Sequence, residues 1–378
     1  MRIMLVSPVG EVGGAEQVFL SLAKRLPEHG IEPVLACLRP GPLEDKARQL
    51  GIPVFSFRNH RLRQWPTALR GVKWLEKLAL DMQIDLLHAN HAAHLYSGLV
   101  SKRTGIPELW HIHDYPYHLD LIERLGLRLP SRHVLFTTER VKSGYKNLLN
   151  VNKSSIIAPT CIDAVKLLAY PAQENIRTRY GLGGGPLFLT VARLQEHKGL
   201  HHLIAAVPQV LRSCPEAEFV IVGKASGMEQ EAYRQRLLAQ CDQLGVSNSV
   251  HFLGYVSDPD VAALYREASA LVHPALTEGY GLTLIEAMLL GLPVIAAAAD
   301  GPQEIIEHQK NGLLVPTADP RRLAEAVVTL LNQPDFAEAL KLGGREFASK
   351  SSSETMAGKT AEIYRTLLEE RPERGHIE

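Results

Sequence analysis

Short apolar runs rich in β-forming residues alternate with helical stretches along this chain, and the alternation occurs twice. Strands of the first series are expected at residues 3–7, 33–38, 53–57, 85–89, 109–113, 133–137 and 155–158. After a glycine-rich break at 181–185, the second series is expected at residues 187–191, 218–222, 250–253, 270–273, 293–297 and 312–315. Most runs are apolar on both faces, which is typical of parallel strands covered by helices on both sides. The sequence therefore predicts an α/β fold with two doubly wound, Rossmann-like parallel sheets.

The length of 378 residues allows two domains, each large enough to bury its own core. We expect an N-terminal domain over residues 1–165 and a C-terminal domain over residues 166–353, facing each other across a cleft. In open α/β sheets, ligands bind beyond the carboxyl ends of the strands. The loops that follow the strands are therefore the places to look for site residues.

Composition argues against several classes of protein. The 41 basic and 41 acidic side chains give no net charge, which argues against a protein whose main partner is a nucleic acid. The four cysteines, Cys37, Cys161, Cys214 and Cys241, form no C-x-x-C pair and are expected as buried free thiols in a reducing compartment. The opening apolar run is too short for a signal peptide, so we expect a cytoplasmic protein.

The sharpest chemical signal lies between residues 271 and 291. A strand is expected to end at His273, a turn follows at Glu278-Gly-Tyr-Gly281, and a helix is expected to begin at Leu282 or Thr283. The unpaired backbone N–H groups of a helix start attract anions, and flanking glycines let a phosphate come close. This segment therefore predicts a binding site for a diphosphate.

Two carboxylates accompany this helix start. Glu286 is the lone charge among residues 281–299, so it is expected to be buried and to need hydrogen-bonding partners. Ribose hydroxyls would serve, and a structural pairing with an arginine or with backbone amides is an equal alternative. Glu278 lies on the turn before the helix, where it is either a site residue or an exposed loop residue.

Two cations follow the first strand of the second series. Arg193 is expected at the end of this strand and Lys198 at the start of the next helix, so both can point toward the same ligand. An arginine fork and a compact ammonium group together suit the charge of a leaving diphosphate. Gly223, after the next strand, opens a glycine-bearing loop of low specificity.

A glycine-led helix start also follows the first strand of the chain, at Gly13-Gly14-Ala-Glu16. The segment does not match G-x-G-x-x-G, and no acidic ribose anchor follows at the distance that a dinucleotide site requires. A dinucleotide-binding dehydrogenase is therefore not favoured.

Histidines are concentrated in two short segments, at His88, His91 and His94 and at His111, His113 and His118. Their spacing matches no standard zinc motif, and H-E-x-x-H is absent, so no metal site is expected. His113 is expected at the end of a strand, lining the cleft, while His111 is expected to pack within the domain. The string Ser257-Asp-Pro-Asp260 is expected as a helix N-cap with a first-turn proline rather than as a metal clamp.

Residues 46–75, here called the basic stretch, carry no acidic side chain and include Arg58, Arg61, Arg63, Arg70 and Lys73. The basic stretch could dock on anionic lipid or hold a charged acceptor. We favour the alternative in which Trp74, with Leu69, Leu75 and Leu78, forms the core face of a helix whose wet side carries the cations.

Taken together, these residues resemble the retaining glycosyltransferases of family 4, which have the two-domain GT-B fold. The resemblance follows the chain from Gly13-Gly14-Ala-Glu16 through His113-Asp114, Arg193, Lys198-Gly199, Gly223 and Phe252-Leu-Gly254 to Glu278 and Glu286. The last two residues are spaced as in the family's E-x7-E motif. The resemblance covers nearly the whole chain and implies a final helix over residues 354–370 that crosses back to complete the N-terminal domain.

The resemblance also implies roles for individual residues. Glu286 would hold the ribose, Glu278 would contact the donor sugar, and the amides of Gly281, Leu282 and Thr283 would bind the distal phosphate. Arg193 and Lys198 would neutralise the diphosphate, the loops at Gly223 and at Tyr255-Val256 would frame the base, and His113 would touch the sugar. Gly13, Gly14 and Glu16 would border the acceptor.

We therefore expect a metal-independent hexosyltransferase that moves a sugar from a nucleoside diphosphate sugar to a hydroxyl acceptor with retention, in glycan, polysaccharide or glycolipid synthesis. The nucleotide sugar is a substrate, so no cofactor is expected, and the acceptor is expected to be a sugar or a lipid-linked group. Contact with the inner face of a membrane through the basic stretch is left open. A sugar-nucleotide epimerase of the same fold and a non-catalytic nucleotide-sugar-binding protein are the two alternatives.

Overall fold

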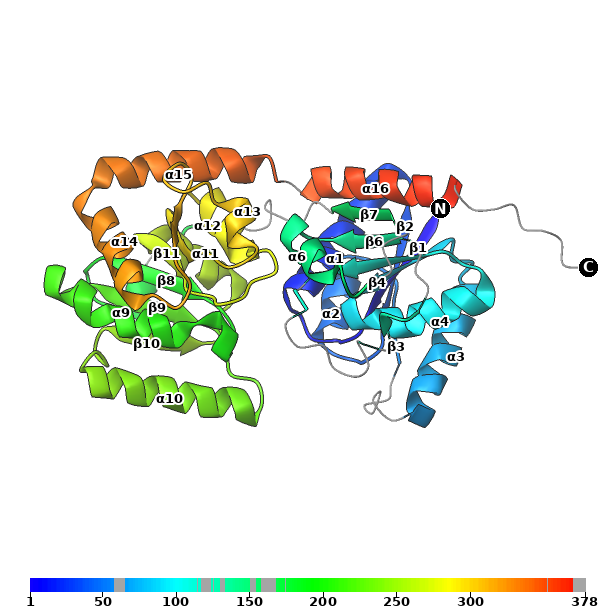
Figure 1. The fold of residues 1–378 in the computed structure, drawn as a ribbon, viewed down its shortest axis with the longest axis horizontal. Coiled ribbons are helices and arrows are strands. Elements are labelled where there is room, and N and C mark those ends of the chain that lie inside the picture. The colour runs from blue at the N-terminus through cyan, green and yellow to red at the C-terminus, as the bar shows by residue number, and fades with distance from the viewer. Residues whose placement is uncertain are drawn as a thin grey trace, which may run out of the picture. The chain divides into compact units, whose positions relative to one another are not determined.

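The computed structural model describes residues 1–57, 65–113, 115–116, 124, 126–129, 133–149, 154–157, 168–173, 175–351 and 353–369. The chain forms two compact units (Figure 1). The N-terminal unit comprises Met1–Ile162 together with Ser352–Glu378, and the C-terminal unit comprises Asp163–Ser351.

The N-terminal unit is built on a parallel sheet of seven strands in the order β3-β2-β1-β4-β5-β6-β7. The strands are β1 (Arg2–Ser7), β2 (Glu32–Cys37), β3 (Val54–Ser56), β4 (Leu86–Asn90), β5 (Glu108–Ile112), β6 (His133–Phe136) and β7 (Ser154–Ile157). The described burial is nearly complete along β1, β4, β5 and β6, as expected for strands covered on both faces. The chain order reverses between β1 and β4, which makes that pair the topological switch point of the sheet.

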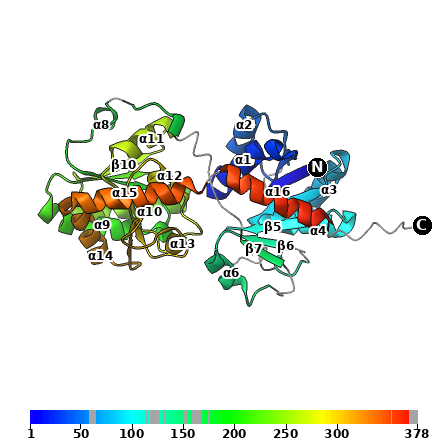
Figure 2. The same ribbon diagram turned by 90° about the horizontal axis from the view of Figure 1, so that it is seen from above.

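Helices cover both faces of this sheet. They are α1 (Gly14–Arg25), η1 (Leu26–His29), α2 (Pro42–Gln49), α3 (Trp65–Asp81), η2 (His91–Ala93), α4 (His94–Thr104), α6 (Glu139–Tyr145) and α16 (Ser353–Glu369). The last helix of the chain, α16, packs on α1 and η1 near the start of the chain (Figure 2). Its Ala357, Ala361 and Tyr364 are fully buried, and Arg365 donates a hydrogen bond of 2.9 Å to the carbonyl of His29.

The C-terminal unit contains a parallel sheet of six strands in the order β10-β9-β8-β11-β12-β13, with its switch point between β8 and β11. The strands are β8 (Leu187–Val191), β9 (Glu218–Val222), β10 (Val250–Gly254), β11 (Ala270–His273), β12 (Val294–Ala297) and β13 (Leu313–Val315). The helices are α8 (Ile176–Arg179), η3 (Glu196–Lys198), α9 (Leu200–Ser213), α10 (Met228–Leu244), α11 (Asp258–Glu267), α12 (Leu282–Leu289), α13 (Pro302–Ile305), α14 (Pro320–Asn332) and α15 (Pro334–Ser349). Two apolar clusters lie on opposite faces of the sheet, one under α9 and α14 and the other under α11 and α12.

The predicted α/β fold class with two doubly wound parallel sheets is confirmed. The predicted N-cap of α11 is also confirmed, because the Ser257 side chain accepts a hydrogen bond from the Asp260 amide and a proline occupies the first turn. Cys37, Cys214 and Cys241 are buried and free, whereas Cys161 lies outside the described residues. Within the described ranges, no helix is long and apolar enough to cross a membrane.

Helix α3 carries the C-terminal part of the basic stretch. Leu75 is fully buried, and Trp74 and Leu78 pack on the core, which confirms the predicted core face for these three residues. The same prediction is wrong for Leu69, whose side of the helix faces solvent and leaves it 47% exposed. Arg58, Arg61 and Arg63 lie outside the described residues.

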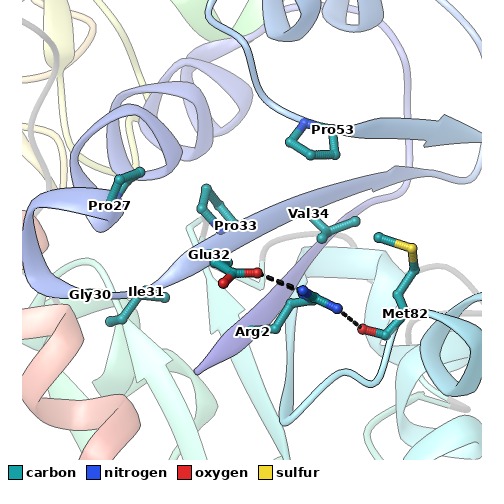
Figure 3. Close-up of a pocket in the computed structure, with 9 residues that line it drawn as sticks. All are labelled: Arg2, Pro27, Gly30, Ile31, Glu32, Pro33, Val34, Pro53 and Met82. Atoms are coloured by element: carbon teal, nitrogen blue, oxygen red, sulfur yellow. Dashed lines mark hydrogen bonds and ion pairs between the residues drawn. The ribbon is translucent and has the colours of Figure 1, made fainter.

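A cavity of about 460 Å³ opens at the amino-terminal edge of the N-terminal sheet (Figure 3). Arg2 lies in its wall, where its guanidinium donates to Glu32 at 2.7 Å and to the carbonyl of Met82 at 2.7 Å. The strands are parallel, so this cavity is at the edge opposite the loops in which the sequence places the site residues.

Candidate functional site

The loops after the strands of the C-terminal unit are joined by backbone hydrogen bonds at the carboxyl edge of the sheet. The Gly223 amide after β9 donates to the Gly254 carbonyl at 2.9 Å. The Leu276 amide after β11 donates to the His197 carbonyl at 2.8 Å, and the Gly301 amide after β12 donates to the Glu278 carbonyl at 2.8 Å. These hydrogen bonds connect the loops that carry the predicted donor-side residues to one another.

Two glycines permit this close approach. Gly223 has φ 149°, and a Cβ atom there would lie 1.9 Å from the Ala192 carbonyl oxygen, beside Arg193. Gly199 has φ 66°, and a Cβ atom would lie 2.0 Å from the Pro274 carbonyl oxygen. Neither position accepts a side chain without displacing backbone, so the two glycines fix where the Arg193 and Lys198 loops lie.

Lys198 and Glu278 form an ion pair across the switch point between β8 and β11. The Lys198 Nζ atom lies 2.8 Å from Glu278 Oε2, and the two side chains are 14% and 17% exposed. The Nε2 atom of buried His273 lies 3.1 Å from the same oxygen. Burial alone would raise the pKa of the Glu278 carboxyl, but the charge of Lys198 and the neighbouring His273 outweigh it and hold the pKa well below its usual range. Glu278 is thus not an exposed loop residue, and its ion pair was not predicted.

Helix α12 begins at Leu282, as predicted, and Gly281 occupies the N-cap position with φ 104°. No side chain caps this end of the helix, and its first turn contains no acidic residue. The amides of Leu282 and Thr283 therefore present an electropositive helix start next to the Lys198–Glu278 pair.

Glu286 lies one turn further along α12 and is partly buried rather than fully enclosed. Its Oε2 accepts a hydrogen bond of 2.7 Å from the hydroxyl of Tyr265 on α11, so the structural partner is a phenol and not the arginine or backbone amides considered from the sequence. Burial raises the pKa of Glu286 to about 7, the Tyr265 hydroxyl opposes the rise, and the charge of Asp258 adds to it. This carboxyl can therefore change protonation near neutral pH.

The remaining predicted donor-side residues, Arg193, Tyr255 and Val256, lie in loops that follow strands of the same sheet. Arg193 is exposed and has no ion-pair partner among the residues that the structure describes. After β10, Tyr255 is 75% exposed, whereas Val256 is buried against the core. An unpaired guanidinium and an exposed aromatic ring are thus both available to a ligand at this edge of the sheet.

In the N-terminal unit, the predicted acceptor-side residues lie at the switch point between β1 and β4. Gly13 is the N-cap of α1 and Gly14 is its first residue. The buried Glu16 carboxylate accepts hydrogen bonds from the Gly13 amide at 3.1 Å and from the Asn90 side chain at 3.0 Å. Glu16 therefore caps its own helix and is held rigidly by β4.

His113 follows β5 and is buried, with its ring against that of His111 at a centroid separation of 3.9 Å. The predicted packing of His111 within the unit is confirmed, because it is buried and hydrogen-bonded to His88 at 3.2 Å. Burial lowers the pKa of His113 well below its usual value, and the neighbouring His111 and His91 add to this, so the ring is neutral at physiological pH. His118 lies outside the described residues.

The first histidine segment does not converge on one point. His88 contacts Tyr364 of α16 at 2.5 Å, whereas His94 pairs with the buried Glu108 at 2.9 Å. Within the part of the chain that the structure describes, no group of three or more histidine, cysteine, aspartate or glutamate side chains is arranged to hold a metal ion.

Comparison with known families matches both units. The family described as Glycosyl transferases group 1 matches residues 172–347, and Glycosyltransferase Family 4 matches residues 12–165. A curated relative, the GDP-mannose-dependent α-(1-6)-phosphatidylinositol monomannoside mannosyltransferase of Mycobacterium tuberculosis, is 31% identical over 241 residues, which cover 61% of each chain. The D-inositol 3-phosphate glycosyltransferase of Segniliparus rotundus is 32% identical over 303 residues, which cover 79% of this chain and 64% of that relative. The chain thus spans about three fifths of the length of these relatives.

Solved structures resemble the chain over almost its whole length. Anabaena HepE in complex with UDP-glucose superimposes with a TM-score of 0.84 at 24% identity, covering 97% of this chain and all of that chain. A glycosyltransferase from Rickettsia africae gives a TM-score of 0.84 at 20% identity, covering 98% of this chain and 99% of the other. The chain therefore has the GT-B fold, and it matches two glycosyltransferase family models in order along its length, family 4 followed by group 1.

Proposed function

We propose that this glycosyltransferase transfers a sugar from a nucleoside diphosphate sugar to a hydroxyl group of a sugar or lipid-linked acceptor, with retention at the anomeric carbon. One observation carries the proposal: the Lys198–Glu278 pair and the unpaired Arg193 stand beside an uncapped helix start at the switch point of the C-terminal sheet. Two cations and free amides suit a diphosphate, and a neighbouring carboxylate suits sugar hydroxyls.

On the donor side, the amides of Leu282 and Thr283 bind the distal phosphate, and Arg193 and Lys198 stabilise the charge that develops on the leaving diphosphate. Glu278, held ionised by Lys198, accepts hydrogen bonds from donor-sugar hydroxyls. Glu286 accepts from the ribose. The Gly223 loop frames the base together with the exposed Tyr255 ring and the backbone at Val256, whose side chain is buried.

On the acceptor side, Gly13 and Gly14 form the wall of the site, and Glu16 keeps that wall rigid through Asn90. His113 touches the donor sugar with its neutral ring. The reaction then depends on positioning and on stabilisation of diphosphate charge, and the protein's cations take the part that a metal ion plays in other transferases.

The class of acceptor follows from the relatives by analogy. The relatives are named for phosphatidylinositol monomannoside and D-inositol 3-phosphate, so we propose a polyol or sugar acceptor in glycan or glycolipid synthesis. One relative is GDP-mannose-dependent, whereas the HepE structure holds UDP-glucose, so the donor base is to be decided by assay. Arg70 and Lys73, both exposed on α3, would let the enzyme work at the anionic inner face of a membrane.

A donor panel tests the proposal. The full-length protein is incubated with GDP-, UDP- and ADP-sugars, and release of the nucleoside diphosphate is measured with and without EDTA. We expect slow hydrolysis of one donor, unaffected by EDTA, and a loss of roughly a hundredfold or more in kcat/KM in Arg193→Ala and in Lys198→Ala. Lys350→Ala, which removes an exposed lysine paired with Glu346, is the matched control and should behave as wild type.

Other outcomes point to other functions. Normal turnover in the double Arg193→Ala, Lys198→Ala variant would contradict the proposed charge stabilisation. Formation of a new sugar nucleotide would identify an epimerase, and binding without turnover would identify a sensor. Once an acceptor is found, NMR of the product's anomeric proton decides between retention and inversion.

A further inference from the structure

The buried phenol of Tyr265 contacts Glu286, and both residues belong to the C-terminal unit. The Tyr265 side chain is fully buried on α11, within the apolar cluster under α11 and α12. Its hydroxyl lies 2.7 Å from Glu286 Oε2 and has no other hydrogen-bond partner in the described part of the chain. A buried hydroxyl thus meets a carboxylate that has a part in the proposed function, and its own role is unassigned.

The direction of this hydrogen bond follows from the chemistry of the two groups. Burial raises the pKa of Tyr265 well above its ordinary value, and the charge of Glu286 adds to the rise, so the phenol keeps its proton. An ionised carboxylate only accepts, so the hydroxyl donates to Oε2. The other carboxylate oxygen, Oε1, has no hydrogen-bond partner among the described residues, and it is not one of their enclosed polar atoms. One oxygen is therefore tied to the interior and the other is left for a ligand.

Helix α11 is itself anchored, which gives the Tyr265 hydroxyl a fixed position. Asp260, in the first turn of α11, accepts hydrogen bonds from the Arg179 guanidinium at 2.5 Å and from the Tyr180 hydroxyl at 2.9 Å. Arg179 is the last residue of α8, and Tyr180 follows it. With the helix held at one end and the Tyr265 ring enclosed at the other, the hydroxyl can hold the carboxylate in one orientation.

Stability alone does not account for this pair. A backbone carbonyl would satisfy a buried phenol equally well, without any charge having to leave water. One hydroxyl does not replace the water that Glu286 loses, because burial raises the pKa of this carboxyl to about 7 although the Tyr265 hydroxyl opposes the rise. A carboxylate retained in such surroundings favours a ligand-binding role over a packing role.

The charged and titratable groups on the neighbouring elements leave Tyr265 as the group that favours the carboxylate. Asp258, also on α11, raises the pKa of Glu286 by its negative charge. On β11, His273 lies at the start of α12, with its Nδ1 atom 3.4 Å from Thr283 Oγ1. On α15, Arg345 lies at the opposite end of α12. Among the described residues, the Tyr265 hydroxyl is the group that lowers the pKa of Glu286.

We propose that Tyr265 is a positioning residue for the donor: its hydroxyl holds Oε2 of Glu286, so that the carboxylate presents Oε1 to the ribose and favours its ionised form. The proposal rests on the proposed function, since it needs Glu286 to bind the ribose. Helix α11 directly follows the loop of Tyr255 and Val256 that is proposed to frame the base, so one helix would serve both parts of the nucleoside.

Donor binding by full-length Tyr265→Phe tests the proposal. Affinities for GDP-mannose and UDP-glucose are measured by calorimetry between pH 6 and 9, where the diphosphate diester keeps its charge. Wild-type affinity should fall as pH drops through about 7, because Glu286 takes up a proton. In Tyr265→Phe the fall should begin about one pH unit higher, since the carboxylate has lost its donor. The Kd at pH 9 should rise about five- to tenfold, whereas kcat for donor hydrolysis should change less than about twofold.

Two further variants separate positioning from packing. Tyr180→Phe removes another phenol that donates to a carboxylate, that of Asp260 on the same helix, at 2.9 Å. It should leave the Kd and its pH dependence unchanged. In the Glu286→Gln background, Tyr265→Phe should have little further effect on the Kd and none on its pH dependence, because the carboxylate through which Tyr265 acts is absent.

A measurement on the wild-type protein covers the case in which Tyr265→Phe does not fold. Tyrosine side chains are labelled with ¹³C at Cζ, and the signals are followed between pH 6 and 9. One tyrosine signal should change with the same midpoint as donor affinity, and this change should disappear in Glu286→Gln. The absence of such a signal overturns the proposal.

The outcomes distinguish the two possible failures. If the wild-type protein binds no nucleotide sugar, the proposed function fails, and the positioning role fails with it. If wild type binds a donor and folded Tyr265→Phe has the same affinity and pH dependence, the positioning role is overturned while the proposed function stands. An equal loss of affinity on adding Tyr265→Phe to Glu286→Gln would mean that Tyr265 acts by packing, which also overturns the role.

Discussion

Glu286→Gln should make the free protein more stable at alkaline pH while weakening donor binding. The Glu286 side chain is partly buried on α12, and its one hydrogen-bond donor among the described residues is the Tyr265 hydroxyl at 2.7 Å. A single phenol does not replace the water that a carboxylate loses on burial. Ionised Glu286 is therefore a destabilising group, which agrees with the proposal that it is retained to bind a ligand.

The magnitude follows from the pKa of the group. Burial raises the pKa of Glu286 from 4.5 to about 7, so the folded state binds a proton that the unfolded state has released between these pH values. The free energy of unfolding therefore falls as pH rises through this window, by at most about 3.4 kcal/mol. Because the side chain is partly exposed, we expect about 2 to 3 kcal/mol. The neutral glutamine escapes this loss, so the variant should match wild type near pH 4.5 and exceed it at pH 8.

Hydrogen exchange in peptides from α11 and α12 of the full-length protein measures this effect locally between pH 5 and 8. Glu229→Gln, an exposed change on α10, is the control. Donor binding is measured in parallel, and Glu286→Gln should raise the Kd at least tenfold, because an amide accepts fewer ribose hydrogen bonds than a carboxylate. A pH dependence identical to that of wild type would refute the reasoning about burial, and unchanged donor affinity would refute the assignment to the ribose.

Two further predictions concern single features of the fold. Gly223→Ala should lower the free energy of unfolding by about 3 kcal/mol and impair turnover, since its Cβ would meet the Ala192 carbonyl, whereas Gly227→Ala, with φ 89° and open space, should cost only about 1 kcal/mol. Equal melting temperatures for the two variants would contradict this. The N-terminal unit should lose stability as pH falls below 6.5, because burial lowers the folded-state pKa of His88 to about 3 and the unfolded chain takes up protons first. Tryptophan fluorescence reports this, since all three tryptophans lie in that unit, and a urea midpoint that does not change between pH 7 and 5 would contradict it.

The fold and the location of the site loops were predictable because they depend on local patterns. Runs apolar on both faces indicate parallel strands, and parallel strands place their following loops at one edge, so Arg193, Lys198 and Glu278 were expected near one another. The start of α12 was predictable for the same reason, since a glycine after a strand precedes an apolar helical pattern.

The partners within the site were not predictable, because they depend on contacts between distant segments. The Lys198–Glu278 pair joins residues 80 apart, and no local pattern favours this pair over two solvated charges. The phenol on Glu286 comes from α11, and the phenol on His88 comes from the last helix, 276 residues away. Leu69 was misplaced because the helical period alone does not fix which way α3 is turned on the sheet.

The two glycine-led helix starts show how one residue changes the chemistry of a similar backbone. In α1, the third helical residue is Glu16, whose carboxylate bonds back to the Gly13 amide and occupies the positive end of the helix. In α12, the corresponding residue is Leu284, which offers no acceptor, so the helix start stays open. An anion would meet a carboxylate at α1 and free amides at α12. The spacing from Gly13 to Glu16 carries this distinction in the sequence, and it supports our proposal that the diphosphate binds at α12 while α1 borders the neutral hydroxyls of an acceptor.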